Sequence, residues 1–232
     1  MVRRSKRYKQ ILEMVDTTKT YGLDEAVEIL KNVPPAKFDE SIDLSFKLTV
    51  DPKKADQQVR GTVSLPHGSG KKVVLVVFAK GNKVQEALAA GADIAGGDEL
   101  VEKVKNGWTD FTAVMATPEM MREVGKLGKI LGPRGLMPSP KAGTVTNDVA
   151  KAVAEIKAGK VEFKVDKSSV INNQVAKVSF TKQQIVDNAQ SIIQAIMRAR
   201  PSSAKGSYVK SLVISTTMGP GLSIATQSFV NA

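Results

Sequence analysis

Residues 73–78 read Val-Val-Leu-Val-Val-Phe, an unbroken apolar run that follows the Pro- and Gly-rich residues 66–70. A strand that is apolar on both faces is typical of a sheet covered by helices on both sides, and such sheets are usually parallel. Helical patterns follow at residues 83–90, 99–106, from about 119, and 148–157, and a second apolar strand is expected at 111–115. This middle segment therefore predicts a small open α/β domain.

The residues on either side of that segment have a different hydrophobic period. Residues 42–50 alternate apolar and polar side chains, which predicts a strand with one wet face, and residues 60–65 predict its neighbour in the sheet. Alternation returns after Lys160, followed by a long helix at 181–198 and an alternating strand at 209–215. Both ends of the chain therefore predict the same kind of sheet, with one face in the core and one face toward solvent.

Neither end of the chain carries a balanced set of elements by itself. Helices are expected at residues 5–15 and 24–32, the first behind a basic leader that we expect to be mobile and that contains Arg3, Arg4, Lys6, Arg7 and Lys9. The two ends together make a two-layer α+β domain. We therefore predict an α/β fold in which residues 1–66 and 159–232 form one split domain and residues 67–158 form an inserted domain.

The chain is strongly basic, with 34 Lys and Arg against 23 Asp and Glu and a formal charge of +11. Such a charge attracts polyanions, of which nucleic acid is the commonest. The excess is +2 in residues 1–66 (12 bases, 10 acids), +3 in 67–158 (13 and 10) and +6 in 159–232 (9 and 3). The split domain is therefore the expected principal RNA-binding unit.

Other classes of protein are disfavoured by composition. No apolar run approaches the ~18 residues that a membrane span requires, so a membrane partner is not expected. Cysteine is absent, which removes disulfides, thiolate nucleophiles and Cys-ligated zinc. The N-terminus lacks the apolar stretch of a signal peptide, and we expect a cytoplasmic protein.

Patterns that carry catalytic chemistry are incomplete in this sequence. The single histidine, His67, has no second His or Cys to complete a metal site, so a hinge position is favoured over a catalytic role. Residues 68–72 resemble half of a phosphate-binding loop, but Leu65 and Lys72 stand where a Gly and a Ser or Thr are needed. Asp98 and Glu99 are best explained as the first turn of a helix. We expect no cofactor, no metal and no enzymatic activity.

Residues 125–145 read GKLGKILGPRGLMPSPKAGTV, a helix with two lysines that runs into a loop dense in Gly and Pro. One interpretation is a rigid surface loop; the other is that its glycines allow close approach of a backbone while four basic residues face phosphates, namely Lys126, Lys129, Arg134 and Lys141. Composition does not decide between them.

This segment, with the preceding Met115-Ala116-Thr117-Pro118, resembles the signature of the bacterial large-subunit ribosomal protein L-one family. The resemblance extends over nearly the whole chain, including residues 61–66, Gly107-Trp108 and residues 216–220. Ser139 departs from the family, which usually has Asn between the two prolines, and this departure puts a local turn contact in doubt.

The resemblance implies that the inserted domain is Rossmann-like and joined to the split domain by two hinges. It implies a structural ribosomal protein, monomeric when free, that binds large-subunit rRNA at the mobile lateral stalk and assists release of deacylated tRNA from the exit site. It also implies repression of translation of its own operon mRNA. The alternatives are a non-ribosomal RNA-binding protein and an RNA-modifying enzyme.

The family's RNA-contacting positions are carried over residue by residue and give a candidate recognition surface. Ser41 departs from the usual Thr, which keeps the hydroxyl but removes a methyl group, and Asn172 stands where His is frequent and is left unassigned. The RNA-binding residues implied are Glu28, Lys37, Phe38, Ser41, Asp166, Lys167, Ser211, Thr217, Met218 and Gly219.

Each of these residue types suits RNA, since aromatic and thioether groups pack on bases while hydroxyls and lysines contact ribose and phosphate. Three alternatives stay open from the sequence. Phe38 is also compatible with a core position, Thr217 with an ordinary strand position, and Glu28 with an exposed helix face.

Overall fold

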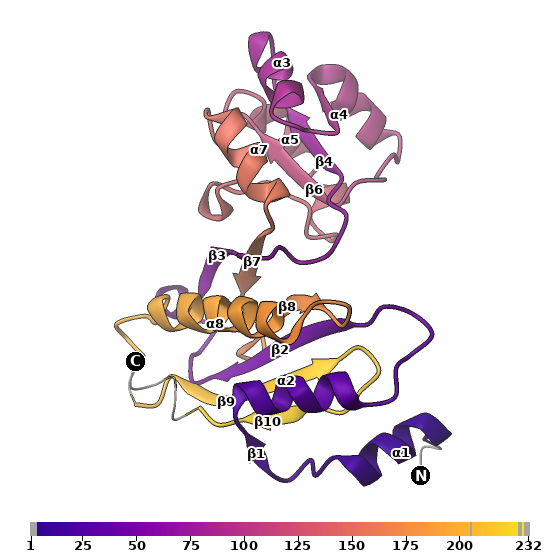
Figure 1. The fold of residues 1–232 in the computed structure, drawn as a ribbon. Coiled ribbons are helices and arrows are strands. Elements are labelled where there is room, and N and C mark those ends of the chain that lie inside the picture. The colour runs from indigo at the N-terminus through magenta and orange to yellow at the C-terminus, as the bar shows by residue number, and fades with distance from the viewer. Residues whose placement is uncertain (1–3, 205, 227–228, 230–232) are drawn as a thin grey trace. The chain divides into compact units, whose positions relative to one another are not determined.

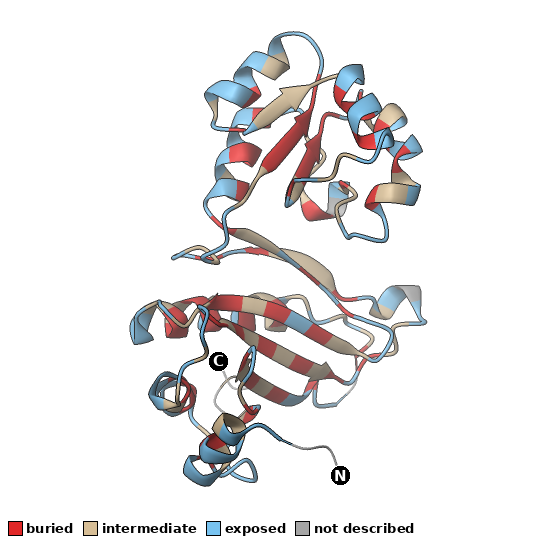
Figure 2. Cartoon of the chain, turned by 90° about the vertical axis from the view of Figure 1, so that its right-hand side faces the viewer, coloured by how far each residue is buried: buried red, intermediate tan, exposed pale blue. Residues whose placement is uncertain are grey.

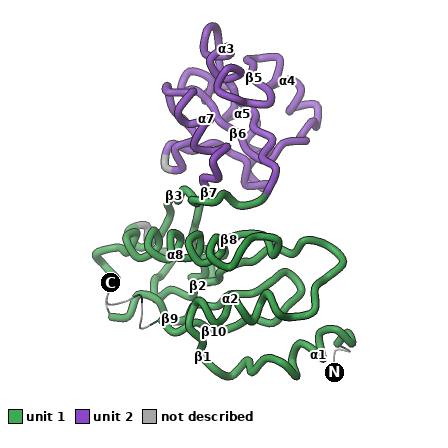
Figure 3. The backbone as a smooth tube through the Cα atoms, in the orientation of Figure 1, with its two compact units in different colours: residues 1–70, 161–232 green, residues 71–160 purple. Residues whose placement is uncertain are grey.

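The computed structural model describes residues 4–204, 206–226 and 229, without the side chains of Ala55 and Lys141. The chain divides into two compact units (Figure 3), which we call unit 1, residues 1–70 and 161–232, and unit 2, residues 71–160. These divisions fall four residues after the one expected at 66 and two residues after the one expected at 158. Arg3 of the basic leader lies outside the described residues.

Unit 1 contains a five-stranded sheet in the order β1-β10-β9-β2-β8 (Figure 1). Strands β10, β9, β2 and β8 pair antiparallel in this order, whereas β1 pairs parallel with β10. Sequence reasoning missed β1 and β10, which are too short to show a period. The strands are β1 (Thr20–Tyr21), β2 (Ser41–Leu48), β8 (Val170–Lys177), β9 (Val209–Thr216) and β10 (Leu222–Ile224).

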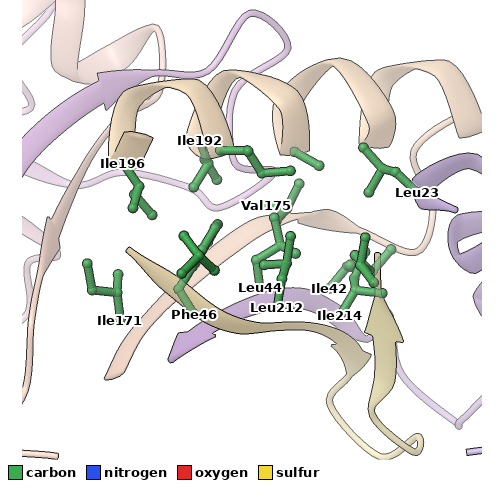
Figure 4. Close-up of a cluster of buried hydrophobic side chains, with 14 of the residues drawn as sticks. Leu23, Ile42, Leu44, Phe46, Ile171, Val175, Ile192, Ile196, Leu212 and Ile214 are labelled. Atoms are coloured by element: carbon green, nitrogen blue, oxygen red, sulfur yellow. The ribbon is translucent and has the colours of Figure 1, made fainter. Parts of the chain in front are cut away.

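The main core lies between this sheet and its helices. In β2 the apolar residues expected to face inward, such as Leu44 and Phe46, are fully or almost fully buried, and they alternate with half-buried polar residues (Figure 2). Ile192 and Ile196 of the long helix α8 (Lys182–Arg198) lie above the side chains of β2, β8 and β9 (Figure 4). The prediction of a strand with one wet face is therefore confirmed.

The prediction that residues 60–65 lie beside β2 is wrong. β3 (Arg60–Ser64) instead pairs with β7 (Lys160–Lys164) in a separate two-stranded sheet. Both sides of β2 are already occupied by β8 and β9, so no hydrogen-bonding edge is left for a sequential neighbour. A short 3-10 helix, η1 (Ala55–Gln57), lies between β2 and β3.

Helix boundaries in unit 1 follow capping chemistry. Helix α1 (Lys6–Met14) begins after Ser5, whose hydroxyl accepts a hydrogen bond from the Tyr8 N–H at 3.2 Å. Helix α2 (Leu23–Asn32) has acids in its first turn and ends before two prolines, and α8 begins with a capping box from Thr181. The leader is less free than expected, because Arg7 is already inside α1 and bonded to distant residues.

Unit 2 contains the expected parallel sheet, in the order β5-β4-β6. All four residues of β4 are buried, because α3 and α7 contribute to one apolar cluster and α4, α5 and α6 to another. The acids Asp98 and Glu99 form the first turn of α4, as expected. The elements are β4 (Leu75–Phe78), α3 (Asn82–Ala89), β5 (Ile94–Gly96), α4 (Asp98–Lys105), β6 (Ala113–Ala116), α5 (Met121–Lys126), α6 (Gly128–Leu131), the 3-10 helix η2 (Pro140–Ala142) and α7 (Val149–Lys157).

His67 lies in unit 1, in the segment that follows β3. The His67 backbone N–H donates to the Asn188 side-chain oxygen at 3.1 Å, and the ring atom Nε2 lies 3.0 Å from a carboxylate oxygen of Asp187. The hydrogen bond from His67, and after it the hydrogen bond from Gln183, hold the pKa of Asp187 below its ordinary value. His67 therefore ties the segment to α8.

Within the described part of the chain, no helix is both long and apolar enough to span a membrane. The same residues include no group of three or more His, Cys, Asp or Glu placed to hold a metal ion.

Candidate RNA-binding surface

The face of the unit 1 sheet opposite α8 is polar. Ser41, Asp43, Ser45 and Lys47 occupy the alternate positions of β2 that do not enter the core. The register places residues of the flanking strands beside them, so one continuous face is formed by Ser41, Asp43, Ser45, Lys47, Asn172, Gln174, Lys177, Ser211, Val213 and Ser215. We call this set the open face. From Ser41 to Lys47 it extends about 20 Å, at roughly 3.3 Å per residue.

Most of the residues implied by the family resemblance gather at the two ends of the open face. We call one end the first cluster, which consists of Lys37, Phe38, Ser41, Thr217, Met218 and Gly219. The other end is the second cluster, which consists of Asp166, Lys167 and Ser211.

In the first cluster, Ser41 and Thr217 bond each other although they lie 176 positions apart in the sequence. The Ser41 N–H donates to Thr217 Oγ1 at 3.0 Å, and the Thr217 N–H donates to the Ser41 carbonyl at 3.0 Å. Thr217 lies just beyond the last residue of β9 and is exposed. It is therefore not an ordinary strand residue, and its side chain closes the end of the β2–β9 pair.

Two large apolar side chains of the first cluster face solvent. Phe38 is 54% exposed and Met218 is 55% exposed. A core position for Phe38 is thus ruled out by the structure. Exposure of an aromatic and a thioether side chain costs hydration free energy that a packed base or ribose face would recover.

A buried carboxylate holds the two segments of the first cluster together. Glu40 is 5% exposed; one of its oxygens accepts hydrogen bonds from Arg7 at 3.1 Å and the Ala36 N–H at 3.2 Å, and the other accepts from the Met218 N–H at 2.8 Å. Arg7 also donates to the Pro34 carbonyl at 3.0 Å and the Met218 carbonyl at 2.9 Å. We call Arg7 and Glu40, with these partners, the Arg7–Glu40 network.

The ionisation of Glu40 follows from these bonds. Burial by itself would raise the pKa of Glu40, but the hydrogen bonds from Met218, Arg7 and Thr216 outweigh it and hold the pKa below its ordinary value of 4.5. The carboxylate is therefore charged at neutral pH, as an acceptor of this many donors must be.

Gly219 completes the turn after β9 by close approach of its backbone. Its N–H donates to the Thr216 carbonyl at 3.2 Å. A Cβ atom at position 219 would collide with the Thr216 hydroxyl. Glycine is therefore required here for space.

The second cluster lies on the turn between β7 and β8 and on β9. One Asp166 carboxylate oxygen accepts the Ser168 N–H at 2.7 Å and the Val170 N–H at 2.8 Å, so Asp166 orders the turn that presents Lys167. Ser211 is exposed and lies opposite Lys47 in the β2–β9 register. Lys47 in turn donates to the Ser168 carbonyl and joins the two parts of the cluster.

Glu28 lies on the exposed side of α2. Its carboxylate bonds Lys182 of α8 at 2.6 Å, and this hydrogen bond holds the pKa of Glu28 below its ordinary value. The structure thus places Glu28 on an exposed helix face, which was one of the two interpretations of this residue.

Sequence reasoning missed Arg7, Glu40 and Lys47 as members of the site. Arg7 was counted only as part of a leader, Glu40 precedes a strand without any pattern, and Lys47 is one polar residue of an alternating strand. Apart from Ala36, which is four positions from Glu40, the partners that these three residues bond lie from 27 to 211 positions away, so a single sequence gives no local signal for them.

The Gly125–Val145 segment lies in unit 2. Lys126 is paired with Glu123 at 2.6 Å, and Arg134 donates to the Thr109 hydroxyl. Lys126 and Lys129 line a cavity of about 540 Å³ between α4 and the α5–α6 region. The Lys141 side chain lies outside the described residues.

The turn at Ser139 forms in spite of the departure from the family. Its N–H donates to Thr144 Oγ1 at 2.8 Å, and the Thr144 N–H donates to its carbonyl at 3.3 Å. Both bonds use the Ser139 backbone.

Comparison with known proteins agrees with this architecture. Residues 30–220 match the model of the ribosomal protein L1p/L10e family. The chain belongs to this family. It is 62% identical over 224 residues to the large ribosomal subunit protein uL1 of Protochlamydia amoebophila, covering 97% of this chain and 95% of that protein. It is 54% identical over 230 residues to the proteins of the same name from Chlamydia pneumoniae (99% of both chains) and Kosmotoga olearia (99% and 100%).

Family membership confirms the resemblance drawn from the Gly125–Val145 segment and the α/β fold that it implied. It also confirms the prediction of a structural ribosomal protein without enzymatic activity.

Proposed function

We propose that this chain binds a folded region of large-subunit rRNA through the open face of unit 1 and the two clusters at its ends, as a structural protein of the ribosome in the cytoplasm. The observation that carries the proposal is the Arg7–Glu40 network, which fixes two distant segments so that Phe38 and Met218 are exposed together. A surface that is ordered before binding loses little conformational entropy when RNA docks. The network favours recognition of one RNA shape over general coating.

The test compares binding isotherms of an rRNA fragment and of random RNA at two salt concentrations. Affinity for both is expected to fall with salt, because counterions are released when lysines neutralise phosphates. The preference for the rRNA fragment is expected to survive, because contacts to base and shape, rather than phosphate contacts, specify the partner. Equal affinity for the two RNAs would reject the proposal and favour a general nucleic-acid-coating protein.

We also propose that the same surface represses translation of the chain's own operon by binding an mRNA site that imitates the rRNA. A single surface for both RNAs predicts mutual competition, and it predicts that Phe38→Ala weakens both by a similar factor. Simultaneous binding of the mRNA site and the rRNA fragment to one protein molecule would contradict this proposal.

A third part of the proposal places the protein at the mobile lateral stalk, where it assists release of deacylated tRNA from the exit site. The basic Gly125–Val145 segment supports a tRNA contact in unit 2, because Lys129 lines an open cavity beside Lys126. Lys129→Ala is expected to slow tRNA release from reconstituted ribosomes while rRNA affinity stays unchanged. Loss of rRNA affinity in Lys129→Ala would instead show that unit 2 contributes to rRNA binding.

A further inference from the structure

A cavity of about 310 Å³ lies directly beside Phe38 in unit 1. It is bounded by the end of α2, by residues 33–36 and 38–40, by the two residues that follow β8 and by Thr216 at the end of β9. Much of the wall is apolar, with contributions from Leu30, Val33, Pro35 and Val178, and the exposed ring of Phe38 forms one side. Its volume is at the lower end of the roughly 300–1,000 Å³ typical of small-ligand sites.

The polar groups of this cavity are held in place by bonds within the protein. The two carboxylate oxygens of Asp39 accept the N–H of Ser179 at 3.1 Å and its hydroxyl at 2.9 Å. Lys31 donates to the Phe180 carbonyl at 2.6 Å, and Glu40 is fixed by the Arg7–Glu40 network. The walls are therefore ordered before any ligand enters.

The charges around the cavity suit a ligand whose anionic part stays outside. Lys31 lines the cavity and Lys37 lies next to Phe38 in the chain. Lys177 donates to the Asp39 carbonyl at 3.2 Å and to Ser41 Oγ at 3.0 Å. The two acids that line the cavity, Asp39 and Glu40, are already engaged by internal donors.

We propose that this cavity receives one unstacked base of the bound RNA, with its face against Phe38 and its flanking phosphates near Lys31 and Lys37. Sequence-specific RNA recognition commonly uses unpaired bases that leave their stack and pack on aromatic side chains. A flat ring with apolar faces and an anionic backbone matches a largely apolar cavity that has Lys31 in its wall and Lys37 next to Phe38 in the chain. This inference rests on the proposed rRNA-binding function and adds to it a pocket that reads a single nucleotide.

Filling the cavity tests the proposal in the full-length protein. Ser179→Phe places a ring in the cavity, Ser179→Ala removes the hydroxyl without filling it, and Ser202→Phe adds the same ring in an exposed turn outside the cavity. Affinity for the rRNA fragment is expected to fall about tenfold or more in Ser179→Phe, the size expected for one lost stacked base. Ser202→Phe should bind as the wild type does, and Ser179→Ala should lose less than Ser179→Phe.

A second measurement uses free adenosine, which has a base but no phosphate, with the wild-type protein. Amide resonances of residues 33, 36–39 and 178–180 are expected to shift on titration, and the same titration with ribose is expected to shift none of them. The titration tests the pocket even if Ser179→Phe fails to fold, because it needs no variant.

Wild-type affinity in a folded Ser179→Phe variant, or adenosine shifts outside this region only, would overturn the pocket while leaving rRNA binding intact. Failure of the proposed function has a different signature, because the wild-type protein itself would then not distinguish the rRNA fragment from random RNA.

Discussion

The two units carry sheets of different kinds, and the difference determines what each can present to a partner. In unit 1, β2 alternates buried and half-buried residues, so one face of the sheet packs on α8 and the other remains polar and open. In unit 2, β4 is buried along its whole length because helices cover both faces. Among the described residues, unit 1 therefore offers the side chains of a whole sheet face to a macromolecule, whereas β4 offers none and most of the exposed residues of unit 2 belong to helices and loops.

The basic residues of the two units are also used differently. In unit 2 several lysines pair with nearby acids, as Lys126 does with Glu123 and Lys80 with Asp98 at 3.0 Å. In unit 1 the half-buried Arg7 instead pairs with the buried carboxylate of Glu40, 33 positions away in the sequence. Ion pairs between distant positions also occur in unit 2, as between Lys157 and Asp93, so the Arg7–Glu40 pair is set apart by the burial of its carboxylate.

The largest expected loss of rRNA affinity comes from replacing Gly219, because a side chain has no space there, whereas Gly128 in unit 2 has space for one. Gly219→Val drives a side chain into the Thr216 hydroxyl and displaces the turn that carries Thr217 and Met218. The loss of rRNA affinity should exceed the roughly 1–3 kcal/mol of a single stacking contact. Gly128→Ala is the control in unit 2, since its Cβ meets nothing within 4 Å. Gly128→Ala should leave rRNA affinity unchanged. Equal losses of rRNA affinity in both variants would contradict the assignment of the rRNA site to unit 1.

The Arg7–Glu40 network should give the next largest effect. Glu40→Gln replaces an acceptor oxygen by an NH₂ group that faces the donors of Arg7, Ala36 or Met218. Arg7→Met leaves the buried Glu40 carboxylate without one of its hydrogen-bond donors. Each variant should lose about 1–3 kcal/mol of both folding stability and rRNA-binding free energy. Because both residues belong to one network, the double variant should lose less than the sum of the two single losses. Lys6→Met, which removes a neighbouring exposed charge from α1, is the matched control. Additive losses in a thermal-melt and filter-binding cycle would show that the network does not act as a unit.

Exposed apolar side chains allow a direct comparison of the clusters with other surfaces. Phe38→Ala and Met218→Ala should each cost roughly 1–3 kcal/mol of rRNA affinity, while stability stays nearly constant because both side chains are more than half exposed. The controls are Leu88→Ala in unit 2 and Met14→Ala in α1, which are 49% and 62% exposed. Unchanged affinity in both cluster variants would remove these residues from the site.

Acid should weaken the two units through different carboxylates. The pKa of Glu40 is depressed in the folded protein, so its stabilising contribution is complete above its ordinary value of 4.5 and is lost as the pH falls through the folded value. Glu40→Gln should therefore show a smaller loss of stability on acidification than the wild type. Asp93→Asn is the counterpart in unit 2, where hydrogen bonds from Lys157 and the Leu75 N–H lower the pKa of Asp93. Denaturant unfolding at several pH values measures both, and identical curves for wild type and Glu40→Gln would contradict the assignment.

The smallest effect should come from restoring the family's usual residue at position 41. Ser41→Thr keeps the hydroxyl and adds one methyl group, worth at most about 0.8 kcal/mol if it is buried against RNA. A modest gain in rRNA affinity is expected by calorimetry. A loss would mean that the Lys177 bond to Ser41 Oγ leaves no room for the methyl group.

Much of the fold was predictable because hydrophobic period is a local property. The alternation around Leu44 and Phe46 predicted the strand and its buried face, and the run ending at Phe78 predicted a strand covered on both sides. The partner of β3 was not predictable, since nothing near residues 60–64 indicates that β8 and β9 occupy both edges of β2. The short strands β1, β5 and β10 contain too few residues to show a period.

For the candidate site, the amino-acid sequence was sufficient to identify the family, the residue types and the basic character of an RNA-binding protein. The tertiary structure was needed to show that Arg7 bonds the Met218 carbonyl across 211 positions of sequence and that Asp166 orders a turn. It was also needed to show that Phe38 lies beside a cavity. The physical reason is that hydrophobic period and composition report only on residues close together in the sequence. The shape of a binding surface depends instead on which distant segments the core brings together.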